Sequence, residues 1–215
     1  MNAILQIPTL KTLLVFSVAF GLTILGLFNI ITMERYALAF AYFFLLSFGL
    51  IWYFKKIFLQ LSSHTRWYVF LYTIGIALLI HIGACYLCLH YLGKPNDAFA
   101  YRGISFLELS GFFIWAKPME VFWQQLMIIV LVKKLESQKL SLYQIMLVCM
   151  AAFGSIHIYQ ALRADAIIGT GFTIIALLFS VLFPYMILNI KNGYLYNYTI
   201  HLTTYSFVAI LIRIV

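Results

Sequence analysis

Residues 67–92 read WYVFLYTIGIALLIHIGACYLCLHYL and contain no Asp, Glu, Lys or Arg. An α-helix rises about 1.5 Å per residue, so a helix over this run is longer than the roughly 30 Å hydrocarbon core of a bilayer. The apolar residues are continuous rather than alternating, which disfavours a strand of a transmembrane β-barrel. The run therefore predicts a membrane-spanning α-helix.

The same pattern continues on both sides of this run. Of the 215 residues, 65% are hydrophobic and 9% are charged, whereas soluble domains carry about 25% charged residues. We therefore predict an all-α integral membrane protein with one transmembrane domain, residues 1–215, built as a polytopic bundle of seven to eight transmembrane helices. The first span is interpreted as retained rather than cleaved. The predicted spans are 12–32, 36–54, 67–92, 119–132, 142–162, 167–190 and 194–214.

The connections between spans carry the topological information. The dense basic groups at 55–66 and 133–139 favour the cytoplasmic side, which places the N-terminus in the cytoplasm of a cell whose inner membrane holds the protein. The longest connection is 93–118, and its apolar half, 104–116, is too short to cross alone and predicts a surface or re-entrant helix. The net charge is +8, but the basic residues are scattered at span ends, so nucleic-acid binding is not expected.

Three ionisable side chains fall inside predicted spans with little other charge: Glu120, His157 and His201. A charged group at the bilayer centre costs about 2.5–3.5 kcal/mol on insertion scales, so it is expected to face a protein interior, to be paired, or to do chemistry. A simpler interpretation pairs Glu120 with Lys117 at a helix start, and treats each histidine as a hydrogen-bonded packing residue.

The 67–92 span holds a second polar group, in which His81 and Cys85 share a helix face. A metal or haem site there would need ligands from another helix. Buried thiols beside a packing histidine are the preferred interpretation, and the sparse cysteines imply no disulfide framework.

Three short patterns resemble the motifs of the CPBP family, the CAAX prenyl proteases and bacteriocin-processing (Abi-type) proteins. That family carries Glu-Glu-x-x-x-Arg, then Phe-x-x-x-His, then His-x-x-x-Asn, on the fourth, fifth and seventh helices. Phe153 to His157 matches the second motif, and the turn at 191–193 leading to His201 is similar to the third. The resemblance covers about residues 115–210, whereas the spans within 1–92 are generic.

The chain departs from those motifs at defined positions. Only Glu120 stands where the family has two glutamates, and Gln124 or Gln125 stands where it has arginine. Tyr205 occupies the asparagine position of the third motif, while Asn197 lies one turn before His201.

The resemblance implies an intramembrane endopeptidase of the glutamate type. In that scheme Glu120 acts as the base, His157 holds the water, His201 donates to the oxyanion, and the hydroxyl of Tyr205 replaces the missing amide. No cofactor is implied, and metal-free chemistry is favoured, although one carboxylate and two imidazoles could bind zinc. The substrate would be a lipidated or leader-bearing peptide at the membrane, or a lipid-linked substrate of acyl transfer. The supporting residues are Gln124, Gln125, Phe153 and Asn197.

Two other functions stay open from the sequence. The incomplete motifs suit a catalytically inactive relative, a membrane scaffold or immunity-type protein that binds a partner. The same ionisable residues could serve a small proton-linked transporter, although no inverted repeat of the kind such folds use is found. The sequence does not indicate an oligomeric state.

Overall fold

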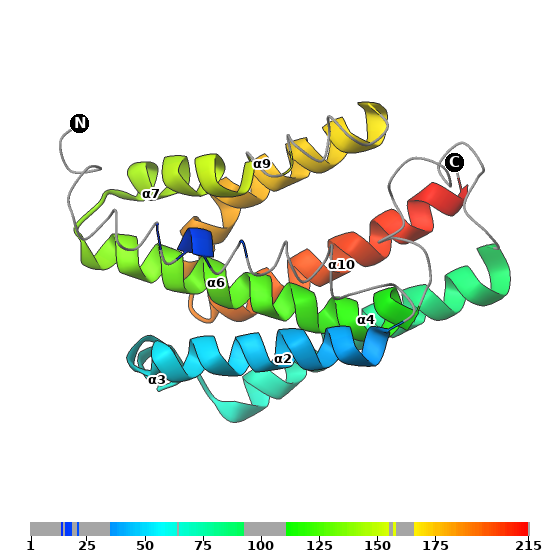
Figure 1. Cartoon of the computed structure of the whole chain (residues 1–215), viewed down its shortest axis with the longest axis horizontal. Helices are drawn as coiled ribbons and strands as arrows, with labels where there is room; N and C mark the ends of the chain where they lie inside the picture. Colours follow the sequence, from blue (N-terminus) through cyan, green and yellow to red (C-terminus); the bar gives the residue numbers. More distant parts are fainter. Residues whose placement is uncertain are drawn as a thin grey trace.

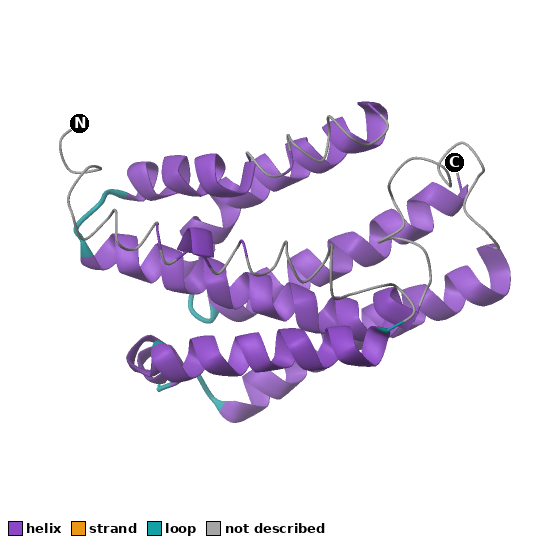
Figure 2. Cartoon of the chain, in the orientation of Figure 1, coloured by secondary structure: helices purple, strands orange, loops and turns teal. Residues whose placement is uncertain are grey.

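The structure is a computed structural model that describes residues 35–63, 65–92, 111–154, 157 and 166–214, with the side chains of 166–168 left out, together with residues 14, 16–18 and 21. Within these residues the chain is helical and has no strand (Figure 2), as the sequence predicts. Most of the predicted 12–32 span, the 93–110 connection and the end of the 142–162 span lie outside the described residues.

The first two long helices match the predicted apolar runs. Helix α2 is Tyr36–Tyr53, and the short α3, Lys55–Ser62, follows a break at Phe54. Helix α4, Trp67–Leu87, continues into a π-helical turn, η2, Cys88–Leu92. The predicted spans 36–54 and 67–92 are therefore confirmed as helices.

The next helix begins earlier than predicted. A π-helical turn, η4, Phe112–Ala116, runs directly into α6, Lys117–Ser137. The predicted span 119–132 is short for a membrane crossing unless residues before Pro118 extend it, and the structure shows that extension; a separate helix ending at 116 is wrong. Proline lacks an N–H and is tolerated in the first turn of an α-helix, so Pro118 at the junction predicts a start; here its missing donor instead falls inside a longer helix.

Local signals explain both ends of the connection after α6. Lys139 adopts a left-handed φ of 61°, and the N–H groups of Lys139 and Leu140 bond to the carbonyls of Glu136 and Leu135, which is a Schellman end. Ser141 then forms a capping box with Gln144. These bonds begin α7, Leu142–Cys149, which continues as the π turn η5, Met150–Gly154.

The last two helices form an antiparallel hairpin. Helix α9 is Ala166–Asn189 and contains Pro184, and α10 is Gly193–Ile214. They match the predicted 167–190 and 194–214 spans. A Cβ on Gly193 would lie 1.9 Å from the carbonyl oxygen of Met186, so the close return of the chain requires glycine here.

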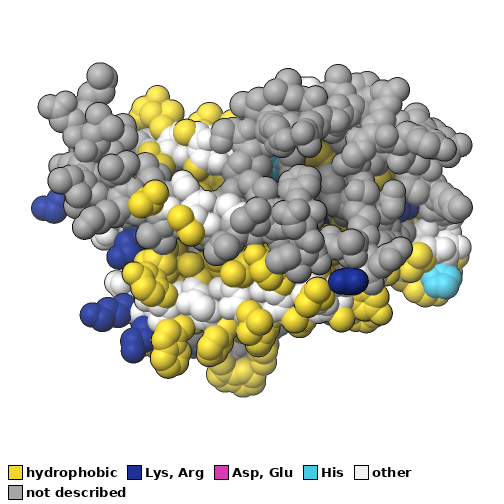
Figure 3. Space-filling view, viewed as in Figure 1, with side chains coloured by type: hydrophobic (Ala, Val, Ile, Leu, Met, Phe, Trp, Pro, Cys, Tyr) yellow, Lys and Arg dark blue, Asp and Glu magenta, His cyan; other side chains and the backbone are white. Residues whose placement is uncertain are grey.

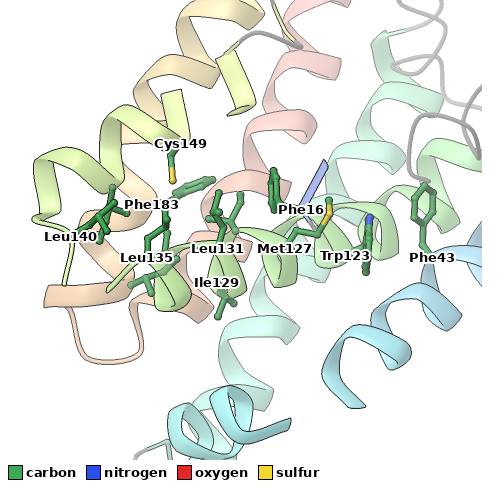
Figure 4. Close-up of a cluster of buried hydrophobic side chains, with 14 of the residues drawn as sticks. Phe16, Phe43, Trp123, Met127, Ile129, Leu131, Leu135, Leu140, Cys149 and Phe183 are labelled. Carbon is green, nitrogen blue, oxygen red and sulfur yellow. The ribbon is translucent and has the colours of Figure 1, made fainter. Parts of the chain in front are cut away.

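Helix α6 is the centre of the arrangement. It packs against α2, α7, α9 and α10, and Figure 1 shows it running lengthwise between α2 and α7. Trp123, Met127 and Leu131 of α6 lie in one buried cluster with Phe43 of α2 and Phe183 of α9 (Figure 4). Helix α4 joins the assembly mainly through α10. The central helix is thus also the one that carries Glu120.

The outer surface is apolar. Three helices among the described residues are long and apolar enough to cross a membrane: Tyr36–Tyr53, Trp67–Leu92 and Gly169–Asn189. Only 17% of the first and 28% of the second is buried within the protein, and Figure 3 shows apolar side chains over much of the described surface in that view. Apolar surface of this extent is typical of a membrane or partner interface.

Candidate functional site

Glu120 lies on α6 and is 3% exposed. Its Oε2 is 2.8 Å from the Nζ of Lys117, and its Oε1 accepts a hydrogen bond of 2.9 Å from the Nε2 of Gln124. Residues three and four apart share one face of a helix, which is why these side chains meet. The ion pair with Lys117 that the simpler interpretation predicts is therefore present, and both carboxylate oxygens have donors.

Lys117 connects this cluster to α10. Its ammonium lies 4.3 Å from the centre of the Tyr205 ring and 5.9 Å from that of Phe112, and the residue is 3% exposed. A cation over an aromatic face is stabilised by the ring quadrupole, more so when both are desolvated. Lys117 thus holds together a carboxylate on its own helix and an aromatic ring on another.

His201 lies beside Tyr205 on α10 and contacts α6 directly. Its Nδ1 is 2.7 Å from the Nε2 of Gln125, and its ring stacks on that of Tyr205 at 5.4 Å with an interplanar angle of 28°. Because an amide N–H donates, Nδ1 accepts and the neutral ring carries its proton on Nε2. Phe179 and Phe183 of α9 enclose the ring from the other side.

His157 is oriented by its own chain. Its Nδ1 is 2.8 Å from the carbonyl oxygen of Phe153, and a carbonyl only accepts, so Nδ1 carries the proton and Nε2 keeps its lone pair. Within the described residues no hydrogen bond joins His157 to Glu120, whose partners are Lys117 and Gln124.

The supporting residues divide into two roles. Gln124 and Gln125 hold Glu120 and His201, as above, and the buried Oε1 of Gln125 has no hydrogen-bond partner among the described residues. Asn197 is fully buried and donates from Nδ2 to the carbonyl of Phe183 at 3.2 Å, while its Oδ1 has no partner within the same part of the chain. Phe153 supplies the carbonyl for His157, and its ring packs edge-on against Phe16 at 5.2 Å.

The predicted site residues are therefore brought together in part. Contacts run without a break through Gln124, Glu120, Lys117, Tyr205, His201 and Gln125. The imidazole of His157 bonds to the carbonyl of Phe153 and joins none of these contacts among the residues that the structure describes. Within the described part of the protein no three His, Cys, Asp or Glu side chains form a group that could hold a metal ion, so the zinc alternative has no geometric support there.

One residue in this region was interpreted from the sequence only as a packing histidine. His81 of α4 is fully buried and hydrogen-bonds through both ring nitrogens, to the carbonyl of Phe113 and to the hydroxyl of Ser206. Cys85, on the same face, is buried and free, as expected. Pro118, which removes a backbone donor near Phe113, is the sequence signal that could have indicated a need for an outside donor.

No family model, curated protein or solved structure matches the chain. The resemblance to the CPBP family thus depends on the three motifs and on the helices that carry them.

Proposed function

We propose that this chain is a polytopic membrane protein of CPBP-like architecture that hydrolyses an amide bond in a membrane-associated peptide. The observation that carries the proposal is the convergence of polar side chains from α6 and α10 inside a bundle whose outer helices are apolar. Helices α6 and α10 are those on which the resemblance expects the first and third motifs. An ionisable side chain inside a membrane protein is by default a hypothesis for a functional site.

The geometry favours His157 rather than Glu120 as the general base. Glu120 is neutralised by Lys117, so it is a weaker base than an unpaired carboxylate would be. The Nε2 of His157 has a lone pair and no partner among the described residues, so it is the better acceptor for a proton from water. Glu120 and Lys117 then contribute a fixed dipole beside the reacting group.

The oxyanion would be stabilised from α10. With Nδ1 of His201 accepting from Gln125, the Nε2–H of His201 is a donor held in one orientation. The hydroxyl of Tyr205, whose ring stacks on His201, is a second candidate donor. A preorganised donor of this kind is worth about 10²–10³ in rate.

The membrane setting is part of the same proposal. Three helices in the described part of the chain are long and apolar enough to cross a membrane. Helices α6 and α10 are of similar length to these, and their polar side chains contact each other inside the bundle. The exposed Lys55, Lys56 and Lys139 would lie on the cytoplasmic side of the cell membrane, together with the N-terminus. The substrate is a lipidated or leader-bearing peptide that reaches the site from the bilayer.

A second function, an inactive scaffold, is favoured by one observation. Both oxygens of Glu120 are already bonded, to Lys117 and Gln124 of the same helix, as expected of a carboxylate whose role is structural. In that case the fold would be kept to bind a membrane partner without turnover.

New peptide N-termini in membranes from cells that express the chain would distinguish the two. Cells with the wild-type protein are compared with cells carrying His157→Ala or His201→Ala, and with the exposed His90→Ala as the matched control. The protease reading expects products that fall by about 10²–10⁴ in His157→Ala, as for loss of a general base, and stay in His90→Ala. If wild-type cells and all variants give equal amounts of these products, or none above membranes from cells without the protein, the protease proposal is refuted and the inactive scaffold is the function supported.

A further inference from the structure

His81 connects three helical segments from a fully buried position. Its Nε2 is 3.0 Å from the carbonyl oxygen of Phe113 in η4, and its Nδ1 is 3.0 Å from the Oγ of Ser206 on α10. The ring also lies 5.1 Å from that of Phe113. No part of the proposed hydrolysis uses this residue, so its pair of buried hydrogen bonds needs another explanation.

The carbonyl of Phe113 has lost its helical donors. The N–H of Lys117, which would bond to Phe113 in an α-helix, bonds instead to Phe112 because this turn is π-helical. The next N–H along would come from residue 118, which is proline and has none. A buried carbonyl is almost always paired in folded proteins, so this one requires a donor from outside the helix.

His81 is that donor. A carbonyl oxygen can only accept, so Nε2 carries the proton. Nδ1 of the neutral ring then accepts the single hydroxyl proton of Ser206, whose Oγ also lies 3.0 Å from the carbonyl oxygen of Leu202. The bond holds the oxygen whose helical donors the π turn and Pro118 remove. Lys117, the next residue after the turn, is the one that contacts Glu120 at 2.8 Å and Tyr205 at 4.3 Å.

We infer that His81 is a positioning residue: by donating to the carbonyl of Phe113 it holds the π turn 112–116 and so sets the Lys117 ammonium between Glu120 and Tyr205. The inference deepens the proposed function, and it depends on that function only for its effect on hydrolysis. The placement of Lys117 and the ionised state of Glu120 can be measured without a substrate.

The test reads the carboxyl of Glu120 by infrared difference spectroscopy of the full chain in lipid nanodiscs, with Glu120→Gln subtracted to assign the bands. Wild type is expected to give a carboxylate band only. His81→Leu should shift a large fraction of that signal to the protonated carboxyl band, because Lys117 no longer neutralises the charge. His81→Gln, which can donate to the same carbonyl, should return the band toward wild type.

A second substitution tests whether the effect of His81→Leu comes from the lost hydrogen bond to Phe113. Pro118→Ala restores an N–H that can bond to the carbonyl of Phe113, so His81→Leu combined with Pro118→Ala should recover the carboxylate band. If His81→Leu alone does not fold, recovery of folding in the double variant supports the inference, and continued failure overturns it. An unchanged carboxylate band in folded His81→Leu also overturns it. Absence of peptide cleavage by wild type would count against the proposed function and leave these bands unaffected.

Discussion

Replacing Lys117 by Met is expected to destabilise the protein far more than the same change at Lys133. Both lysines lie on α6 and pair with a glutamate three residues later, but the exposed fractions are 3% and 4% for Lys117 and Glu120 and 20% and 44% for Lys133 and Glu136. Removing one partner of a buried pair costs about 3–5 kcal/mol, because the other charge stays behind. Exposed pairs are worth about 0–1 kcal/mol.

The cost at Lys117 should depend on the charge of Glu120. With Lys117 gone, the carboxylate keeps one donor, Gln124, in an apolar surrounding. Adding Glu120→Gln removes the stranded charge, so the Lys117→Met, Glu120→Gln double variant should regain most of the lost stability. Large coupling between the two changes is what contact within one network produces.

The measurement is the free energy of unfolding in mixed detergent micelles, followed by tryptophan fluorescence. The protein has four tryptophans, and Trp123 is buried on α6 close to the pair. Equal losses in Lys117→Met and Lys133→Met would refute the reasoning, since the ion pair would then be no more desolvated than a surface pair. A double variant as unstable as Lys117→Met would refute it as well.

The remaining predictions concern the hairpin and the topology. Gly193→Ala should cost about 1–3 kcal/mol or more through overpacking, because its Cβ would overlap the carbonyl of Met186; Gly49→Ala, where a Cβ meets nothing within 4 Å, should cost little, and equal unfolding energies in the same micelle assay would contradict this. Cysteines introduced at Lys55 and Lys139 should react with a membrane-impermeant maleimide only from the cytoplasmic side, the native cysteines being buried; labelling from the outside of intact cells would reverse the proposed orientation.

The long helices are the part of the fold that sequence reasoning predicts well. The 36–54, 67–92, 167–190 and 194–214 runs all form helices near the expected bounds, because helix formation in such segments follows from apolar length alone. The error at the start of α6 has a specific cause. Pro118 is typical of a first turn, and sequence spacing does not indicate that a π turn precedes it.

The candidate site is predictable only where its contacts are local. The pairing of Lys117 with Glu120 follows from a spacing of three residues on one helix. The bonds from Gln125 to His201 and from His81 to Phe113 join residues far apart in sequence, so they depend on how helices pack. The apolar context of His157 and His201 singles them out in the sequence. The sequence does not indicate which hydrogen-bond partners decide on which ring nitrogen each carries its proton.

The π turn at 112–116 has a consequence for insertions and deletions in this region. A π turn contains one residue more than an α turn, so it has the geometry of an α-helix into which a single residue has been inserted. Deleting one residue there would restore ordinary winding and rotate everything upstream by about 100° relative to Glu120, which would carry the carbonyl of residue 113 away from His81. A one-residue deletion on this side of Pro118 would therefore also disturb the packing of η4 against α2.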